Sequence, residues 1–148
     1  RAYSNYQLSI RNGSEKFSFE IAINIEKEVL DNEGIHTSNQ IDLKKFSQPR
    51  SNLVKGWYYE QLKLWLDKFP EEQILVISTE ELETNPQKTM KEVFQFLKLP
   101  EHNLKKFQKL KLAQYEQMDS KIRNELSNYF KPKNEKLFSL IGKKFDWE

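Results

Sequence analysis

A chain of 148 residues is long enough for one domain, and its 37% hydrophobic and 31% charged residues exclude wholesale disorder. Its 24 Lys and Arg residues against 22 Asp and Glu give a net charge of +2. This balance excludes the global positive field of a dedicated nucleic-acid binder, so no nucleic-acid partner is expected. The absence of Cys excludes disulfides, thiolate metal sites and a Cys nucleophile.

The histidines and the aliphatic runs argue against a metal site and a membrane helix. His36 and His102 are the only histidines, and neither has a metal-ligand neighbour at helical spacing, so we expect no metal site. The longest aliphatic run covers residues 74–77, far short of the ~20 residues that a membrane helix needs. We therefore expect no membrane span. The absence of Cys and the abundance of Lys, Asn and Ile favour a cytoplasmic location.

Two helices are predicted at the start of the chain. Residues 2–12 carry apolar side chains among polar ones and end at the turn signal Asn12-Gly13. Residues 18–30 repeat this pattern, with Ser18 as the N-cap. The apolar positions of the second helix are Phe19, Ile21, Ala22, Ile25 and Val29. Residues 31–51 then form a long polar connection, of a length that is typical of functional or mobile loops.

The middle of the chain predicts a helix followed by a strand. Residues 53–69 place apolar side chains three and four positions apart, and Pro70 stops the helix. This spacing favours core packing for Trp57, Tyr58, Trp65 and Phe69 over sugar stacking. Residues 73–79 resemble a strand buried on both faces, which implies a parallel sheet. One strand forms no sheet alone, so its partners come from missing sequence, another chain or unrecognised strands. Its exposed edge predicts self-association of the isolated chain.

The last third of the sequence is predicted to be mainly helical. Either one residue of the Glu80-Glu81 pair caps the next turn, which we favour, or the pair lies at a ligand site after the strand. Asn85-Pro86 begins one helix, and Asp119-Ser120 begins another. Pro132 then restarts a final helix, which Gly142 closes.

Several sequence segments along almost the whole chain, apart from residues 14–50, form an ordered series of motifs. The segments are Arg1-Ala2-Tyr3-Ser4-Asn5-Tyr6, Gly56 to Pro70, Gln73-Ile74-Leu75-Val76-Ile77 with Glu80 and Leu82, Val93 to Pro100, Tyr115 with Met118, Tyr129-Phe130 to Leu137, and Gly142 to Trp147. In these segments and their order the chain resembles the glycosaminoglycan-type (heparan sulfate) sulfotransferases, which use 3′-phosphoadenosine-5′-phosphosulfate as donor.

The resemblance implies an α/β, P-loop-NTPase-like sulfotransferase fold. Residues 1–148 correspond to the C-terminal, mainly helical part of a single sulfotransferase domain with one clear strand, and the N-terminal phosphosulfate-binding part is absent from this sequence. No G-x-x-x-x-G-K motif occurs, and the chain begins at Arg1 without a Met, which predicts a truncated or processed sequence. The family's catalytic lysine and carboxylate base lie in the absent part. We therefore assign no catalytic residue and expect the chain alone to be inactive.

The first nucleotide-binding residues that the resemblance implies are Ser4 and Arg1. Ser4 corresponds to the serine that donates its hydroxyl to the 3′-phosphate of the nucleotide. Its place on the first helical turn agrees, because unpaired backbone N–H groups and the helix dipole favour an anion there. The alternative is that Ser4 merely starts the helix. Arg1 is a secondary candidate, since the family's main phosphate-gripping arginine lies upstream of it.

The second nucleotide-contacting stretch of the family resembles K-G-R-x-Y-P. Lys111 and Tyr115 match this pattern, whereas Leu112 and Ala113 replace the small and the cationic residue. The replacement removes a guanidinium fork suited to phosphate.

The function that the resemblance implies is transfer of a sulfuryl group from 3′-phosphoadenosine-5′-phosphosulfate to a hydroxyl or an amine, with a carbohydrate favoured as acceptor and no metal required. The alternative is a non-catalytic helical module that holds a polyanion with the basic stretch Lys98–Lys111.

Overall fold

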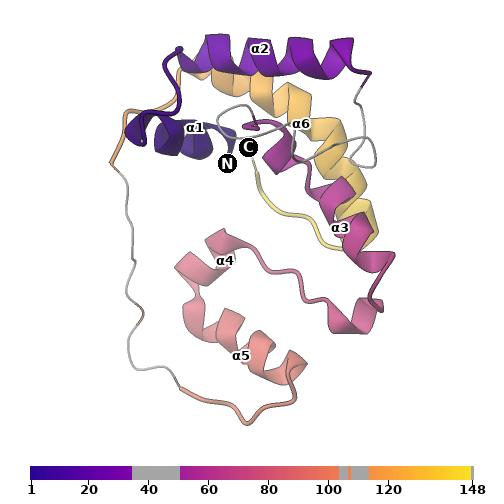
Figure 1. The fold of residues 1–148 in the computed structure, drawn as a ribbon. Coiled ribbons are helices and arrows are strands. Elements are labelled where there is room, and N and C mark those ends of the chain that lie inside the picture. Colours follow the sequence, from indigo (N-terminus) through magenta and orange to yellow (C-terminus); the bar gives the residue numbers. More distant parts are fainter. Residues whose placement is uncertain (35–50, 104–106, 108–113, 148) are drawn as a thin grey trace. The chain divides into compact units, whose positions relative to one another are not determined.

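The computed structural model describes residues 1–34, 51–103, 107 and 114–147, and within these ranges all regular secondary structure is helical (Figure 1). The helical elements are α1 (Ala2–Arg11), α2 (Phe19–Asn32), η2 (Val54–Gly56), α3 (Tyr58–Leu66), η3 (Glu71–Gln73), α4 (Thr79–Thr84), α5 (Pro86–Phe96) and α6 (Ser120–Ile141), where η marks a 3₁₀ helix. The chain forms two compact units, one of Arg1–Trp65 with Tyr115–Asp146 and one of Leu66–Gln114 with Trp147.

The first unit has an aromatic core between α1, α2, the η2 segment and α6. The ring centroids of Tyr3 and Phe19 lie 5.0 Å apart, and so do those of Tyr6 and Phe19. The main cluster of buried side chains contains Ala2, Tyr6, Phe19, Ala22, Ile23, Leu53 and Leu126. A smaller cluster contains Leu30, Val54 and Trp57. Tyr129 and Phe130 of α6 pack against both clusters, so the core of this unit is continuous.

Local capping signals predicted several helix ends correctly. Ser18 accepts a hydrogen bond from the backbone N–H of Ile21, and Asn85 accepts one from that of Lys88. Asp119 accepts two from the first turn of α6, at 2.8 and 3.1 Å. At the other end of this helix, Gly142 takes the left-handed conformation, with φ +62°. These predictions are confirmed because each depends only on neighbours within one turn.

The buried face of α2 differs from the predicted one. Ile21, expected in the core, is 48% exposed. The helix instead buries Phe19, Ala22, Ile23, Glu26 and Leu30. Both sets have helical spacing, and the helix is rotated so that Ile23 and Leu30 enter the core. This rotation also carries the Glu26 carboxylate inside.

The predicted strand 73–79 does not form among the described residues. Gln73 ends η3, Thr79 begins α4, and the residues between them have no regular secondary structure. The backbone is nevertheless extended at Ile74 and Ser78. A strand requires a neighbour for its backbone N–H and C=O groups, and the described part of the chain supplies none to this segment.

Two further predictions from the sequence are wrong. Pro132 does not restart a helix, because α6 continues through it. A proline removes one hydrogen bond to the carbonyl four residues earlier and its ring crowds that carbonyl, but the buried Leu126 and Leu137 hold α6 on both sides of it. Trp57 is buried as predicted, but Trp65 is 61% exposed and Phe69 is 44% exposed. The helix α3 covers only Tyr58–Leu66, so the predicted stripe does not extend to residue 69.

A close contact explains the glycine that begins the G-x-Y segment. A Cβ atom added at Gly56 would lie 2.7 Å from the Phe130 ring carbon Cε1. Real Cβ atoms do not approach another atom so closely, so the ring and a larger side chain cannot share this space. Two of the sequence segments that carry the family resemblance therefore contact each other at Gly56 and Phe130.

The second unit contains a helical pair, α4 and α5. The α4 helix starts with a capping box, in which Ser78 and Glu81 each accept a hydrogen bond from the other's backbone N–H. This confirms the prediction that one residue of the Glu80-Glu81 pair caps the turn, and that residue is Glu81. The α5 helix ends in a Schellman motif, in which the Leu99 N–H donates to the Phe94 carbonyl. The residue in the left-handed conformation at this end is Lys98, with φ +55°, where glycine is usual.

Replacing Lys98 with Gly is expected to raise the free energy of unfolding by about 0.5–1 kcal/mol, because glycine adopts positive φ without a Cβ clash. Gly13 occupies the corresponding position after α1, with φ +70°. The control Gly13→Ala should therefore lower the free energy of unfolding by about 1 kcal/mol. Chemical denaturation of both variants tests the argument, and a less stable Lys98→Gly protein would contradict it.

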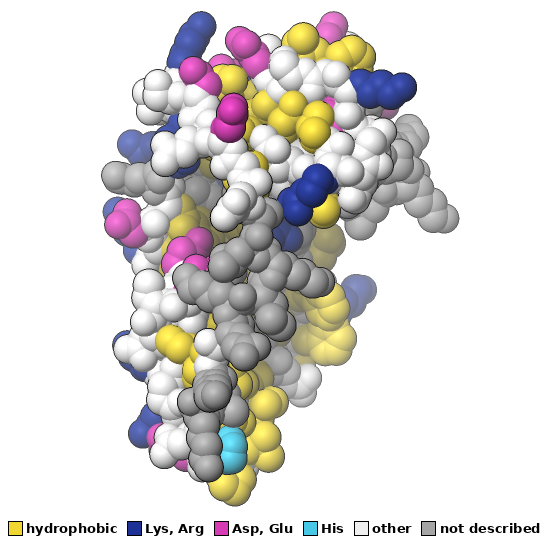
Figure 2. Space-filling model, turned by 90° about the vertical axis from the view of Figure 1, so that its left-hand side faces the viewer, with side chains coloured by type: hydrophobic (Ala, Val, Ile, Leu, Met, Phe, Trp, Pro, Cys, Tyr) yellow, Lys and Arg dark blue, Asp and Glu magenta, His cyan; other side chains and the backbone are white. Residues whose placement is uncertain are grey.

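The surface of the molecule carries charges of both signs. In the view of Figure 2, Lys and Arg side chains are interspersed with Asp and Glu, and hydrophobic side chains reach the surface in several places. None of the helices in the described ranges combines the length and the apolar character needed to cross a membrane.

Candidate anion-binding site

The first turn of α1 carries a set of backbone hydrogen-bond donors that have no acceptor inside the helix. The first bond within the helix runs from the Asn5 N–H to the Arg1 carbonyl, at 3.0 Å. The N–H groups of the three preceding residues therefore have no acceptor inside the helix. Arg1 is the N-cap and makes no side-chain cap. Ser4 is exposed at the third helical position, so it is not the cap, and its hydroxyl lies at the positive end of the helix dipole.

Tyr115 lies beside this turn. Its ring meets the Tyr3 ring edge to face, with centroids 5.6 Å apart, and 42% of Tyr115 is exposed. Tyr3 in turn contacts Phe19 of the core. The structure thus brings Arg1, Ser4 and Tyr115 together in one unit, although Tyr115 is distant from the others in sequence. Lys111, the fourth predicted residue, lies outside the described residues.

A polar network joins α1 to the η2 segment. The Asn5 side chain donates to Asn52 Oδ1 at 2.7 Å, and its own Oδ1 accepts from Lys55 Nζ at 2.9 Å. Burial lowers the pKa of Lys55, and the positive charge of Arg1 lowers it further. Asn5 follows Ser4 directly, so this network fixes the Lys55 ammonium near the first turn of α1.

The buried carboxylate of Glu26 holds the start of η2. Its oxygens accept hydrogen bonds from the backbone N–H groups of Asn52, Leu53 and Val54, at 2.8, 2.9 and 3.1 Å. Burial raises the pKa of Glu26 to about 7, although the three hydrogen bonds and the Lys55 charge oppose the shift. Because residues 52–54 lead directly into Lys55, Glu26 is a positioning residue for the network.

Four residues of this network were not predicted from the sequence, namely Asn5, Glu26, Asn52 and Lys55. One signal was available for Glu26, since it lies four residues before Leu30 and three after Ile23, in the middle of an apolar helical stripe. A charged residue at a core position requires partners. No local pattern identifies Asn5, Asn52 and Lys55, because their contacts join segments that are far apart in sequence.

The charge and geometry of the site suit an anion. Two cationic side chains, a hydroxyl and several backbone N–H groups lie at a helix N-terminus, an arrangement that favours a phosphate or sulfate group. The described residues contain no group of three or more His, Cys, Asp or Glu side chains placed to hold a metal ion.

Comparison with known proteins identifies the family. The model of the sulfotransferase domain matches residues 1–148, which is the entire sequence. The chain belongs to the sulfotransferase domain family.

Relatives of this sulfotransferase chain are longer than the chain itself. The membrane-associated sulfotransferase kil1 of Dictyostelium discoideum is 36% identical, over 65% of this chain and 20% of its own length. The human bifunctional heparan sulfate N-deacetylase/N-sulfotransferase 3 is 33% identical, over 62% of this chain and 13% of its own length. The chain therefore spans a fifth or less of these two relatives.

A solved structure supports the sulfotransferase fold. The crystal structure of a sulfotransferase from Alicyclobacillus acidocaldarius aligns with a TM-score of 0.73 at 24% identity. The alignment covers 97% of this chain and 51% of that one. The chain thus has the fold of about half of that sulfotransferase, and the predicted fold is confirmed at this level. The predicted strand is the part that the described residues do not contain.

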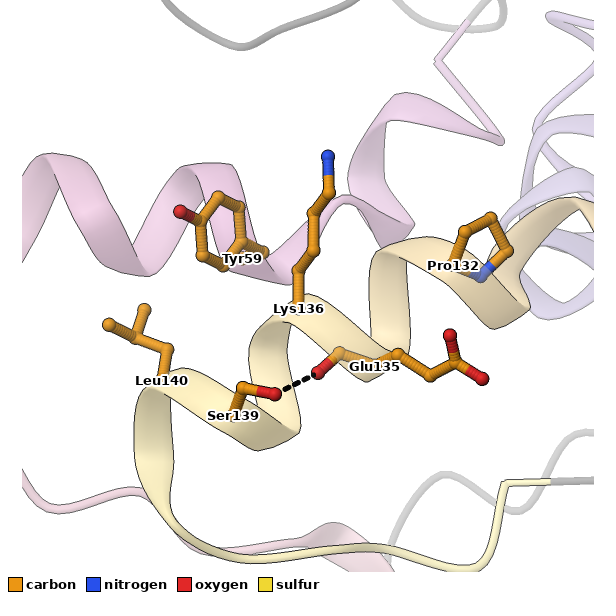
Figure 3. A pocket seen from close by; sticks show the side chains of 6 residues that line it. All are labelled: Tyr59, Pro132, Glu135, Lys136, Ser139 and Leu140. Atoms are coloured by element: carbon orange, nitrogen blue, oxygen red, sulfur yellow. Dashed lines mark hydrogen bonds between the residues drawn. The ribbon is translucent and has the colours of Figure 1, made fainter.

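The sulfotransferase chain also has a cleft of about 580 Å³ between α3 and α6 (Figure 3). It is lined by Tyr59, Pro132, Glu135, Lys136, Ser139 and Leu140. The Ser139 hydroxyl donates to the Glu135 carbonyl at 3.0 Å. Arg1, Ser4 and Tyr115, the predicted nucleotide-binding residues that the structure describes, do not line this cleft, so it is separate from the anion-binding site.

The alternative function, a polyanion-binding module, depends on the basic stretch Lys98–Lys111. Lys98 closes α5, and Lys91 nearby forms an ion pair with Glu101 at 3.1 Å. Residues 104–106 and 108–113, which contain the other lysines of the stretch, lie outside the described residues. That alternative stays a prediction.

Proposed function

We propose that residues 1–148 form the helical, nucleotide-binding part of a sulfotransferase that uses 3′-phosphoadenosine-5′-phosphosulfate. The observation that carries the proposal is the first turn of α1, where the exposed Ser4 and backbone N–H groups without an acceptor inside the helix lie beside Tyr115. The membership of the chain in the sulfotransferase domain family supports the same role. In this proposal, Ser4 donates its hydroxyl to the 3′-phosphate of the nucleotide, and Arg1 adds positive charge.

The proposed reaction moves a sulfuryl group to an acceptor oxygen or nitrogen. The acceptor lone pair forms the new bond to sulfur, the bond from sulfur to the donor phosphate breaks, and the acceptor loses its proton. The nucleotide product is adenosine 3′,5′-bisphosphate. Residues 1–148 contribute binding and orientation of the donor, which place the reacting groups in line. We assign no catalytic residue within them.

We propose a carbohydrate with an amine or a hydroxyl group as the acceptor. The names of the mammalian relatives include heparan sulfate N-sulfotransferase activity, which supports an amino sugar. Lys111 and Tyr115 complete the proposed nucleotide site, as the resemblance of residues 111–116 to the family's second nucleotide-contacting stretch implies.

Adenosine 3′,5′-bisphosphate should raise the melting temperature of the complete protein, because a ligand that binds only the native state stabilises it. At a concentration about 100-fold above its Kd, the gain is about 2.7 kcal/mol. Differential scanning fluorimetry measures the shift. Adenosine 5′-phosphate, which lacks the 3′-phosphate, is the matched control and should give a smaller shift. An unchanged melting temperature at millimolar adenosine 3′,5′-bisphosphate would count against the proposed function.

A further inference from the structure

Lys55 occupies an unusual electrostatic position. It lies in η2, and its Nζ donates to Asn5 Oδ1 at 2.9 Å. Asn5 directly follows Ser4 in α1. The Arg1 charge acts on the same ammonium group. The fold therefore holds two like charges near the N-terminus of α1, which already carries a partial positive charge. These positive charges and the helix N-terminus together favour an anion in their vicinity.

The buried Glu26 carboxylate does not neutralise Lys55. Both of its oxygens are engaged by the backbone N–H groups of residues 52–54. Lys55 forms no ion pair with an acidic side chain in the described ranges, in contrast to Lys27 with Glu125 and Lys91 with Glu101. The attraction of Glu26 on Lys55 is also weaker than the repulsion by Arg1. The positive charge of Lys55 is thus available to a ligand.

Buried polar atoms next to Lys55 also lack partners. Asn52 is 1% exposed, and its amide nitrogen has no hydrogen-bond acceptor among the described residues. Its amide oxygen is bound to Asn5, so the unpaired nitrogen belongs to the same network as Lys55. The hydroxyl of the adjacent, buried Ser51 also has no hydrogen-bond partner in the part of the chain that the structure describes. Buried polar groups normally have partners, so these donors are a second indication of a ligand with acceptor oxygens.

We propose that Lys55 binds the 3′-phosphate of the nucleotide together with Ser4 and Arg1. The proposal rests on the proposed function and adds a residue that the nucleotide-binding segments of the sequence do not contain. Asn5 positions the Lys55 ammonium through its side-chain oxygen, and Glu26 positions the backbone that leads to Lys55. A lysine is suited to this role because its three N–H donors contact phosphate as a compact positive charge.

Isothermal titration calorimetry on the complete protein tests the proposal. Lys55→Ala should weaken binding of adenosine 3′,5′-bisphosphate by about ten- to a hundredfold, and Lys55→Arg should retain most of it. Binding of adenosine 5′-phosphate should change little, because it has no 3′-phosphate. The loss should shrink as the salt concentration rises. Lys63→Ala removes an exposed lysine of α3 and is the matched control, with unchanged affinity expected.

The outcomes separate this proposal from the proposed function. If the wild-type protein does not bind adenosine 3′,5′-bisphosphate, the proposed function fails and the role of Lys55 fails with it. If the wild type binds and Lys55→Ala binds equally well, only the role of Lys55 is overturned. An equal loss for both nucleotides also overturns it, since that result indicates a general structural role. Lys55→Met keeps the apolar stem and gives the decisive measurement if Lys55→Ala does not fold.

Discussion

Replacing Glu26 with Ala should lower the free energy of unfolding by about 3–5 kcal/mol, the largest stability effect that we expect for a single side chain. The substitution leaves three buried backbone N–H groups, those of residues 52–54, without acceptors. Each unpaired buried donor costs about 1–3 kcal/mol. The change also opens a cavity at a position that is 1% exposed. Chemical denaturation of the complete protein measures the loss.

Two further variants show whether the loss of stability comes from the missing acceptor oxygens of Glu26. Glu26→Gln keeps one acceptor oxygen, so its loss should be smaller than that of Glu26→Ala. Glu28→Ala removes an exposed carboxylate from the same helix and should change the free energy of unfolding by less than about 0.5 kcal/mol. Equal stability of Glu26→Ala and Glu28→Ala would show that the buried carboxylate does not hold residues 52–54.

The same carboxyl group should make stability depend on pH. Its pKa is raised from 4.5 to about 7 in the folded state, so the folded protein holds the proton more tightly than the unfolded chain does. The stabilisation that this group contributes is therefore fully present below pH 4.5 and is lost as the pH rises to about 7. The decline amounts to about 3 kcal/mol. Glu26→Gln has no titrating group at this position, so the wild type should lose stability relative to this variant across that range.

Local signals predicted the helix ends well, whereas contacts between distant segments could not be predicted. Ser18, Asn85 and Asp119 cap their helices through bonds that span two or three residues. The α4 helix had such a signal too, because Ser78 and Glu81 have the spacing of a capping box. The glutamate of this box was predicted as a cap, whereas its partner Ser78 was not. The strand at residues 73–79 depends on a neighbouring strand, which no local pattern in this sequence supplies.

The candidate site was predicted only in part for the same reason. Arg1, Ser4 and Tyr115 were found through the resemblance of their segments to the family, and the Tyr3 ring brings Tyr115 to the first turn of α1. Lys55 belongs to no such pattern. Its place in the site depends on Asn5, which is fifty residues away in sequence. The extended contact network that fixes a charged group beside a helix end becomes visible only in three dimensions.

Replacing Ser4 with Ala should weaken binding of adenosine 3′,5′-bisphosphate by about ten- to a hundredfold, because a hydrogen bond to a charged phosphate contributes roughly 1.5–3 kcal/mol. The free energy of unfolding should stay the same or rise slightly. Ser4 is not the N-cap of α1, and Ala is a better helix former than Ser. The effect on affinity and the effect on stability therefore separate a phosphate-binding role from a capping role, for which stability would fall by about 1 kcal/mol at unchanged affinity.

Two hydroxyl variants, one at the same position and one in α6, are the controls for Ser4→Ala. Ser4→Thr keeps a hydroxyl at the site and should retain most of the affinity. Ser127→Ala removes an exposed hydroxyl from α6, and nucleotide affinity should be unchanged. Calorimetric titration and denaturation of the same three proteins give both quantities. If Ser4→Ala and Ser127→Ala bind the nucleotide equally well, the 3′-phosphate does not depend on the Ser4 hydroxyl, and the anion must be held by the remaining groups at the start of α1.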